Sequence, residues 1–150
     1  MEELKEVGES RQYIVIKIGE EQYGIDIEFI DNIVRMQHIT RVPKVPSYIK
    51  GVINLRGEVL PVLSLRLKMD LPEDEITKNS RIIILKMEQL GMVGFIVDEV
   101  KEVVTLGTDQ IEKISHGNKE EKTYYISAVG QYEGGLISLL DLNVVAAEKK

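Results

Sequence analysis

The sequence has no cysteine, so it can form no disulfide, thiolate nucleophile or cysteine-based metal site. Its two histidines, His38 and His116, are far apart and lack the i, i+4 spacing of a metal-binding pair on a helix. No apolar run approaches the ~20 residues that a membrane-spanning helix needs, and the charged segment 1–11 does not resemble a signal peptide. We therefore expect a cytoplasmic protein without a metal or cofactor.

Aromatic residues are also scarce, with no tryptophan and two phenylalanines, so stacking platforms for nucleic-acid bases are not expected. The net charge of −6 opposes the basic field that non-specific nucleic-acid binding requires. The sequence contains no P-loop, G-x-G-x-x-G, G-x-S-x-G or EF-hand pattern. The adjacent acids at 98–99 point to opposite faces of a strand, and those at 73–75 lie in a polar loop, where we expect them to be solvated. This inventory predicts no catalytic residue and favours an adaptor over an enzyme.

The charge is unevenly distributed along the chain. Between positions 35 and 68 the only acidic residue is Glu58, which gives this segment a charge of +6 and leaves −12 for the remainder. The seven cations of this basic segment are Arg35, Arg41, Lys44, Lys50, Arg56, Arg66 and Lys68. A local basic segment in an acidic protein suits an acidic surface on a partner protein, but the same cations could be scattered over a solvated face.

Short apolar stretches separated by turn signals every ~8–12 residues predict an all-β barrel or sandwich. The expected strands cover residues 13–18, 22–25, 37–42, 52–55, 59–63, 81–87, 92–97, 100–106, 124–132 and 136–140. A short amphipathic helix is expected after Asp26, because Ile27, Ile30 and Val34 follow the i, i+3, i+7 spacing. Single helical turns are expected over 64–69 and after Asp141. Residues 107–123 are expected to be irregular.

The stretch 51–65, GVINLRGEVLPVLSL, predicts a β-hairpin. Two apolar runs meet at Arg56-Gly57, where glycine can supply the positive φ of a tight turn. Pro61 has no N–H to donate, so it suits an edge strand or a bulge. The apolar residues of the hairpin are expected in the core. The residues left free at its tip are Asn54, Arg56 and Gly57.

The chain also resembles itself. An offset of 77 lays residues 57–65 on 134–142, with glycine matching glycine at the turn, and an offset of 70 lays 23–25 on 93–95. The order of these elements predicts two small five-stranded, SH3-like barrels that arose by duplication, with a seam between them. We expect residues 1–150 to form one domain of two intertwined barrels, ordered from about 12 to 147.

Four segments carry a resemblance to a known family: EEQYGIDIEFIDNI (20–33), ITRVP (39–43), YIKGVINLRGEVLPVLSLR (48–66) and VGFIVDEVKEVV (93–104). They resemble the CheW family of bacterial chemotaxis coupling proteins, over about residues 13–142. The resemblance implies two packed SH3-like barrels without catalytic activity. It also implies an adaptor that joins the cytoplasmic tip of chemoreceptors to the regulatory domain of the histidine kinase CheA.

The same resemblance implies a protein that is monomeric on its own and joins larger arrays, where it is recruited to membrane receptors without entering the membrane or binding nucleic acid. A CheW-like module of a CheA-type or CheV-type protein is the alternative. The receptor-binding positions implied by the family are Ile30, Asn32, Ile33, Lys50, Gly51, Arg56, Gly94 and Val103. Arg56 could bond a partner or its own hairpin backbone. Gly51 and Gly94 could be contacts or backbone requirements. No residue is implied for the kinase contact.

Overall fold

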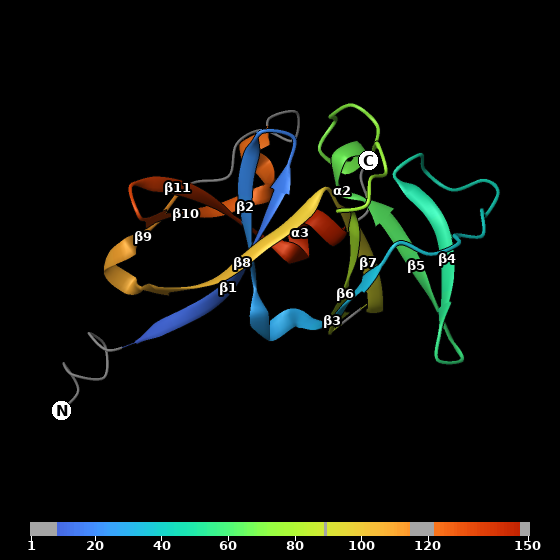
Figure 1. The fold of residues 1–150 in the computed structure, drawn as a ribbon, viewed down its shortest axis with the longest axis horizontal. Helices are drawn as coiled ribbons and strands as arrows, with labels where there is room; N and C mark the ends of the chain where they lie inside the picture. Colours follow the sequence, from blue (N-terminus) through green and yellow to red (C-terminus); the bar gives the residue numbers. More distant parts are fainter. Residues whose placement is uncertain (1–8, 89, 115–121, 148–150) are drawn as a thin grey trace. The chain divides into compact units, whose positions relative to one another are not determined.

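The computed structural model describes residues 9–88, 90–114 and 122–147, and it is mainly β (Figure 1). The first sheet has the strand order β8 (Glu99–Gly107), β1 (Ser10–Ile18), β2 (Glu21–Asp26), β11 (Gly135–Leu140), β10 (Ile126–Tyr132) and β9 (Ile111–Lys113). The second has the order β3 (Ile30–Arg35), β6 (Arg81–Met87), β7 (Gly91–Val97), β5 (Glu58–Ser64) and β4 (Ile49–Leu55). The helical elements are η1 (Ile27–Phe29), α2 (Leu65–Lys68), η2 (Thr108–Gln110), η3 (Lys122–Tyr125) and α3 (Leu142–Ala146).

The chain divides into two compact units, which confirms the predicted all-β fold with two subdomains. The first unit contains the described residues up to Glu28 together with those from Lys101 onward, and the second extends from Phe29 to Val100. After β2 the chain enters the second unit as β3, and after β7 it returns to the first as β8. Each sheet thus has at one edge a strand, β8 in the first and β3 in the second, that directly follows a strand of the other sheet.

Each unit has its own apolar core. In the first unit the core cluster consists of Tyr13, Val15, Val104, Leu106, Ala128, Ile137 and Leu139. In the second it consists of Ile53, Leu60, Val62, Ile82, Ile84 and Ile96. Both clusters draw on the predicted strands, which are rich in β-branched and leucine side chains.

The predicted repeat is visible in the pairing of the strands. In the first unit Leu139 pairs with Gly24 across a parallel ladder, and in the second Val62 pairs with Gly94 in the same way. The offset of 77 relates Val62 to Leu139, and the offset of 70 relates Gly24 to Gly94, so the two pairs occupy equivalent positions. The antiparallel hairpins β10–β11 and β4–β5 are likewise equivalent, with positive φ at Glu133-Gly134 and at Arg56-Gly57.

The repeat extends to the helical turns that follow the hairpins. Ser64 accepts a hydrogen bond from the Leu67 N–H and caps α2, and Asp141 accepts one from the Val144 N–H and caps α3. Positions 64 and 141 differ by the same offset of 77, as do 67 and 144. Both caps satisfy N–H groups that a helix start leaves without a partner. The two predicted helical turns are confirmed.

The predicted helix after Asp26 is wrong. The chain makes only the 3₁₀ turn η1, and Ile30 and Val34 then lie in strand β3, which pairs with β6. Asp26 still behaves as a cap, because its Oδ1 accepts the Glu28 N–H at 2.9 Å. The run IDNIVR satisfies a helical spacing, but its β-branched residues also fit a strand. A bulge between Ile30 and Asn32 shifts the alternation of side chains between the two faces of the sheet. The two-residue period typical of a strand is therefore not visible in the sequence.

Two other boundaries differ from expectation. Within 37–42, the predicted strand reduces to a single bridge between Thr40 and Val52. The stretch 107–123, expected to be irregular, contains η2 and the short strand β9, which pairs with β10 and gives the first sheet a sixth strand. Residues 1–8 and 115–121 lie outside the described part of the chain.

The hairpin β4–β5 is confirmed, and Gly51 is the residue that allows Thr40 to approach it closely. Gly51 has φ of +145° at a bulge in β4, where a Cβ would collide with the Thr40 carbonyl oxygen. The close approach allows Thr40 and Val52 to exchange two backbone hydrogen bonds, of 2.9 and 2.8 Å. Glycine is required here by the backbone, both for its φ and for the space.

We predict that Gly51→Ala lowers the free energy of unfolding by about 2 kcal/mol or more, because the new Cβ strains the backbone and breaks the Thr40–Val52 bridge. Gly57→Ala is the matched control, since Gly57 also has positive φ (+84°) but open space around it. It is expected to cost about 1 kcal/mol. Urea unfolding of both variants tests this, and equal losses would show that the contact with Thr40 contributes nothing.

Candidate functional site

Seven of the eight receptor-binding positions inferred from the resemblance lie in the second unit, and Val103 lies in the first. Within the second unit they fall into separate groups: Ile30, Asn32 and Ile33 on β3, and Lys50, Gly51 and Arg56 on the β4–β5 hairpin. These strands stand at opposite ends of the strand order of their sheet. Gly94 lies between them on the central strand β7.

The β3 group is only half-buried. Ile30 pairs with Leu85, and Ile33 pairs with Ile83, so the strand is held by β6 on one side. The side-chain oxygen Oδ1 of Asn32 is buried and has no hydrogen-bond partner among the described residues. An unsatisfied buried acceptor costs free energy that a donor from a bound partner could recover. This oxygen was not foreseeable from the sequence, because the segment was expected to be a helix and Asn32 lies instead in β3.

Arg56 lies exposed at the tip of the hairpin with φ of +55°. The turn is closed by another residue, since Asn54 Oδ1 accepts the Gly57 N–H at 3.0 Å. Among the described residues, nothing forms a hydrogen bond or ion pair with the Arg56 side chain. Asn54, and not Arg56, therefore makes the side-chain hydrogen bond to the hairpin backbone. The Arg56 guanidinium remains available to another molecule.

The two predicted glycines are explained by the sheet itself. Gly94 is buried on β7, where it pairs with Ile84 on one side and Val62 on the other. A Cβ there would lie 2.8 Å from the Ile82 Cγ2 atom, closer than side chains tolerate. Together with the collision at Gly51, this shows that backbone or packing requirements account for both glycines. No contact with a partner is needed to explain glycine at either position.

The seven cations of the basic segment divide into two groups. Three are engaged within the unit: Lys50 Nζ lies 3.0 Å from Glu73 Oε2, Arg66 pairs with Asp98, and the buried Lys68 ammonium lies 3.9 Å from the centre of the Tyr48 ring. The other four have exposed side chains that make no hydrogen bond or ion pair with any described residue: Arg35, Arg41, Lys44 and Arg56. The basic segment is therefore partly structural and partly a free cationic surface.

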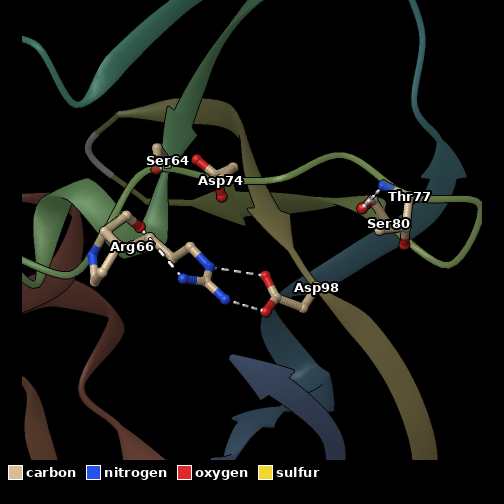
Figure 2. A network of polar contacts seen from close by, with 7 residues as sticks. Ser64, Arg66, Asp74, Thr77, Ser80 and Asp98 are labelled. Atoms are coloured by element: carbon tan, nitrogen blue, oxygen red, sulfur yellow. Dashed lines mark hydrogen bonds and ion pairs between the residues drawn. The ribbon is translucent and has the colours of Figure 1, made fainter. Parts of the chain in front are cut away.

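Arg66 and Asp98 form a bidentate ion pair in the second unit (Figure 2). Arg66 Nε donates to Asp98 Oδ1 at 3.0 Å and Nη2 donates to Oδ2 at 2.5 Å, while Nη1 reaches the Pro72 carbonyl at 3.3 Å. Asp98 raises the pKa of Arg66, chiefly through this hydrogen bond. Bidentate pairs of this kind fix geometry as well as adding energy. Asp98 thus fastens α2 to the end of β7 and acts as a structural group.

Ser64 links α2 to the acidic loop 70–80. Its Oγ accepts the Leu67 N–H at 3.1 Å and donates to Asp74 Oδ2 at 2.5 Å, and Figure 2 shows both side chains beside the Arg66–Asp98 fork. Burial raises the pKa of Asp74, and the bond from Ser64 opposes that shift. Asp74 Oδ1 is buried without a hydrogen-bond partner among the described residues. The loop acids were expected to be solvated, and for Asp74 this is wrong.

Within residues 9–88, 90–114 and 122–147, no three His, Asp or Glu side chains are placed to hold a metal ion. No helix in that part of the chain has the length and apolar character to cross a membrane. Asp74, an acid whose pKa is raised, does not line the cavities of about 600, 490 and 420 Å³.

We predict that Asp74→Asn changes how stability depends on pH. Because the folded pKa of Asp74 is raised, the native state holds its proton more tightly than the unfolded state. The contribution of Asp74 is therefore fully favourable below the ordinary aspartate pKa of about 3.9 and is lost as pH rises through the folded pKa. Relative to Asp74→Asn, the wild type should gain stability as pH falls from neutral to about 3.5.

Urea unfolding of both proteins across this range measures the difference. Glu75→Gln, which removes an exposed acid from the same loop, is the control for general charge effects. A difference between wild type and Asp74→Asn that stays constant with pH would contradict the prediction.

The comparisons with known proteins agree on one family. The model of the CheW-like domain matches residues 12–150. "Chemotaxis protein CheW" of Bacillus subtilis is 38% identical over 140 residues, which cover 93% of this chain and 89% of that protein. Chemotaxis protein CheW of Helicobacter pylori is 33% identical, with coverage of 86% and 77%. The crystal structure of scaffolding protein TtCheW from Thermoanaerobacter tengcongensis superposes with a TM-score of 0.82 at 28% identity, covering 93% of this chain and 90% of that one.

Proposed function

Because the chain belongs to the CheW-like domain family, we propose that it is a non-catalytic adaptor of bacterial chemotaxis signalling. In this role it couples the cytoplasmic tip of transmembrane chemoreceptors to the regulatory domain of the histidine kinase CheA. Relatives named as chemotaxis and scaffolding proteins, aligned over most of their own length, support the assignment. The proposed place of action is the cytoplasm, at membrane-anchored receptor arrays.

The observation that supports the receptor contact most directly is the free guanidinium of Arg56 at the hairpin tip. Its neighbour Gly57 makes the turn and Asn54 closes it, so the side chain of Arg56 is not needed for the hairpin fold. An arginine in this state can form charge-assisted hydrogen bonds with a carboxylate on a receptor. Ile30 and Ile33 on β3 add half-buried apolar surface to the proposed receptor contact.

The kinase contact is proposed only at the level of the whole protein. Exposed strand edges suit a partner of the same fold, but no residue is assigned to that contact. A CheW-like module of a CheA-type or CheV-type protein remains the alternative. Binding experiments with the two isolated partners distinguish an adaptor, which binds both, from a module that binds one.

We predict that Arg56→Glu weakens binding to a receptor cytoplasmic fragment by about tenfold or more, because it replaces a charge-assisted bond with a repulsion. Binding to the CheA regulatory domain should stay unchanged, as should the melting temperature, since Arg56 is exposed. Titration of both partners by calorimetry measures the two affinities.

The matched control is Glu133→Arg, because Glu133 occupies the equivalent turn position in the first unit with φ of +50°. It reverses a charge in the same backbone setting and should leave receptor binding unaltered. If Arg56→Glu binds the receptor fragment as the wild type does, the receptor contact does not include the hairpin tip.

We predict opposite outcomes for Val103 and Gly94. Val103 is 49% exposed, so Val103→Asp should weaken receptor binding without lowering the melting temperature. Gly94 is buried against Ile82, so Gly94→Val should lower the melting temperature because a side chain cannot fit. Thermal unfolding followed by receptor titration separates the two effects. A stable Gly94→Val variant with impaired binding would show that Gly94 is a contact position.

A further inference from the structure

The second unit contains a cavity of about 600 Å³. Its walls come almost entirely from the segment between Ile39 and Lys50, closed by Leu67 of α2 and Glu73 of the acidic loop. Pro43 and Pro46 fix the backbone along one wall, because each proline restricts its own φ and the residue before it. A volume of this size lies in the range of ligand-binding pockets, about 300–1,000 Å³.

The cavity is lined by three of the cations of the basic segment. Arg41 and Lys44 are exposed and form no hydrogen bond or ion pair with any described residue. Lys44 is held with φ of +63°, a conformation that residues other than glycine rarely adopt. Lys50, the third, has a side chain that is 28% exposed. The walls therefore present positive charge that the unit itself leaves largely unpaired.

A carboxylate already occupies one part of this site. Glu73 Oε2 lies 3.0 Å from Lys50 Nζ, although the Glu73 side chain is 64% exposed and belongs to a neighbouring loop. The pair shows that the cavity wall accepts a carboxylate at hydrogen-bond distance. An exposed ion pair of this kind contributes little stability, about 0–1 kcal/mol, so a competing carboxylate can displace it.

Apolar groups lie between the cations. Ile39, Val45 and Ile49 line the cavity as half-buried side chains, and Val42 is 37% exposed beside Arg41. An extended peptide that carries both acidic and apolar side chains can satisfy both kinds of group. A small inorganic anion would leave the apolar wall uncovered.

We propose that this cavity binds an extended acidic segment of a partner protein, in which carboxylates pair with Arg41 and Lys44 and displace Glu73 from Lys50. The site goes beyond the receptor contact proposed above, because it lies on the segment 39–50 and does not require the hairpin tip. Lys50 belongs to both surfaces, so the test relies on Arg41 and Lys44 instead.

The probe is a fluorescein-labelled peptide, Glu-Val-Glu-Leu-Glu with blocked ends, and the measurement is fluorescence anisotropy with the full chain. The wild type should bind it more tightly than the matched Gln-Val-Gln-Leu-Gln peptide, and added salt should weaken the binding. The double variant Arg41→Glu/Lys44→Glu should weaken binding by about tenfold or more. Glu73→Gln should tighten it severalfold, because the internal competitor is removed.

Two variants serve as controls with unchanged expected affinity. Arg35→Glu reverses an exposed, unpaired cation of the same unit that does not line the cavity, and Glu75→Gln neutralises an acid two positions from Glu73. Equal losses in Arg35→Glu and the double variant would overturn the proposal in favour of diffuse charge attraction. Absence of binding to both wild type and Glu73→Gln would also overturn it. Because Arg56→Glu should bind the acidic peptide normally, failure here is distinguishable from failure of the receptor contact.

Discussion

The constraint on which each unit depends is a parallel strand pairing centred on a glycine. In the second unit Gly94 pairs with Val62, and in the first Gly24 pairs with Leu139. A Cβ on Gly24 would lie 2.7 Å from a Leu139 methyl group, as one on Gly94 would lie 2.8 Å from Ile82. At both positions an added Cβ would force its neighbour to move, Leu139 in the first unit and Ile82 in the second. The hairpin that carries the exposed tip is attached to its sheet through this pairing, so the tip is positioned by a buried glycine.

The two halves of the repeat share a framework and differ at the surface. Arg56 at one hairpin tip corresponds to Glu133 at the other, in the same positive-φ conformation, so the charge is reversed without altering the turn. In the helical turns the buried Lys68 corresponds to the buried Val145. Lys68 is accommodated because its ammonium lies over the Tyr48 ring, a cation–π contact that offsets part of the cost of burial. Two copies of one framework can therefore present surfaces of different chemistry.

Much of the candidate site was predictable because its signals are local. The Arg56-Gly57 turn follows from a glycine between two apolar runs, and the Ser64 and Asp141 caps follow from polar residues before short helical turns. The helix predicted after Asp26 failed because the pairing of β3 with β6 overrides a spacing that fits both structures. The partners of Asp74 and Lys50 were not predictable either, since Ser64 and Glu73 approach them only through the path of the loop 70–80.

The sequence by itself determined the all-β character, the repeat, the exposed basic turn and the family, because each depends on residue type and order along the chain. Only the tertiary structure decided which strands share a sheet, since β3 and β8 each join the sheet of the other half after a connection that carries no pairing signal. It also decided which cations are free. Arg66 and Arg56 look alike in sequence, yet Arg66 is held by Asp98, 32 positions away, whereas Arg56 faces solvent. Pairing between charges that are distant in sequence depends on how far apart they lie in the folded structure, and the composition does not give that distance.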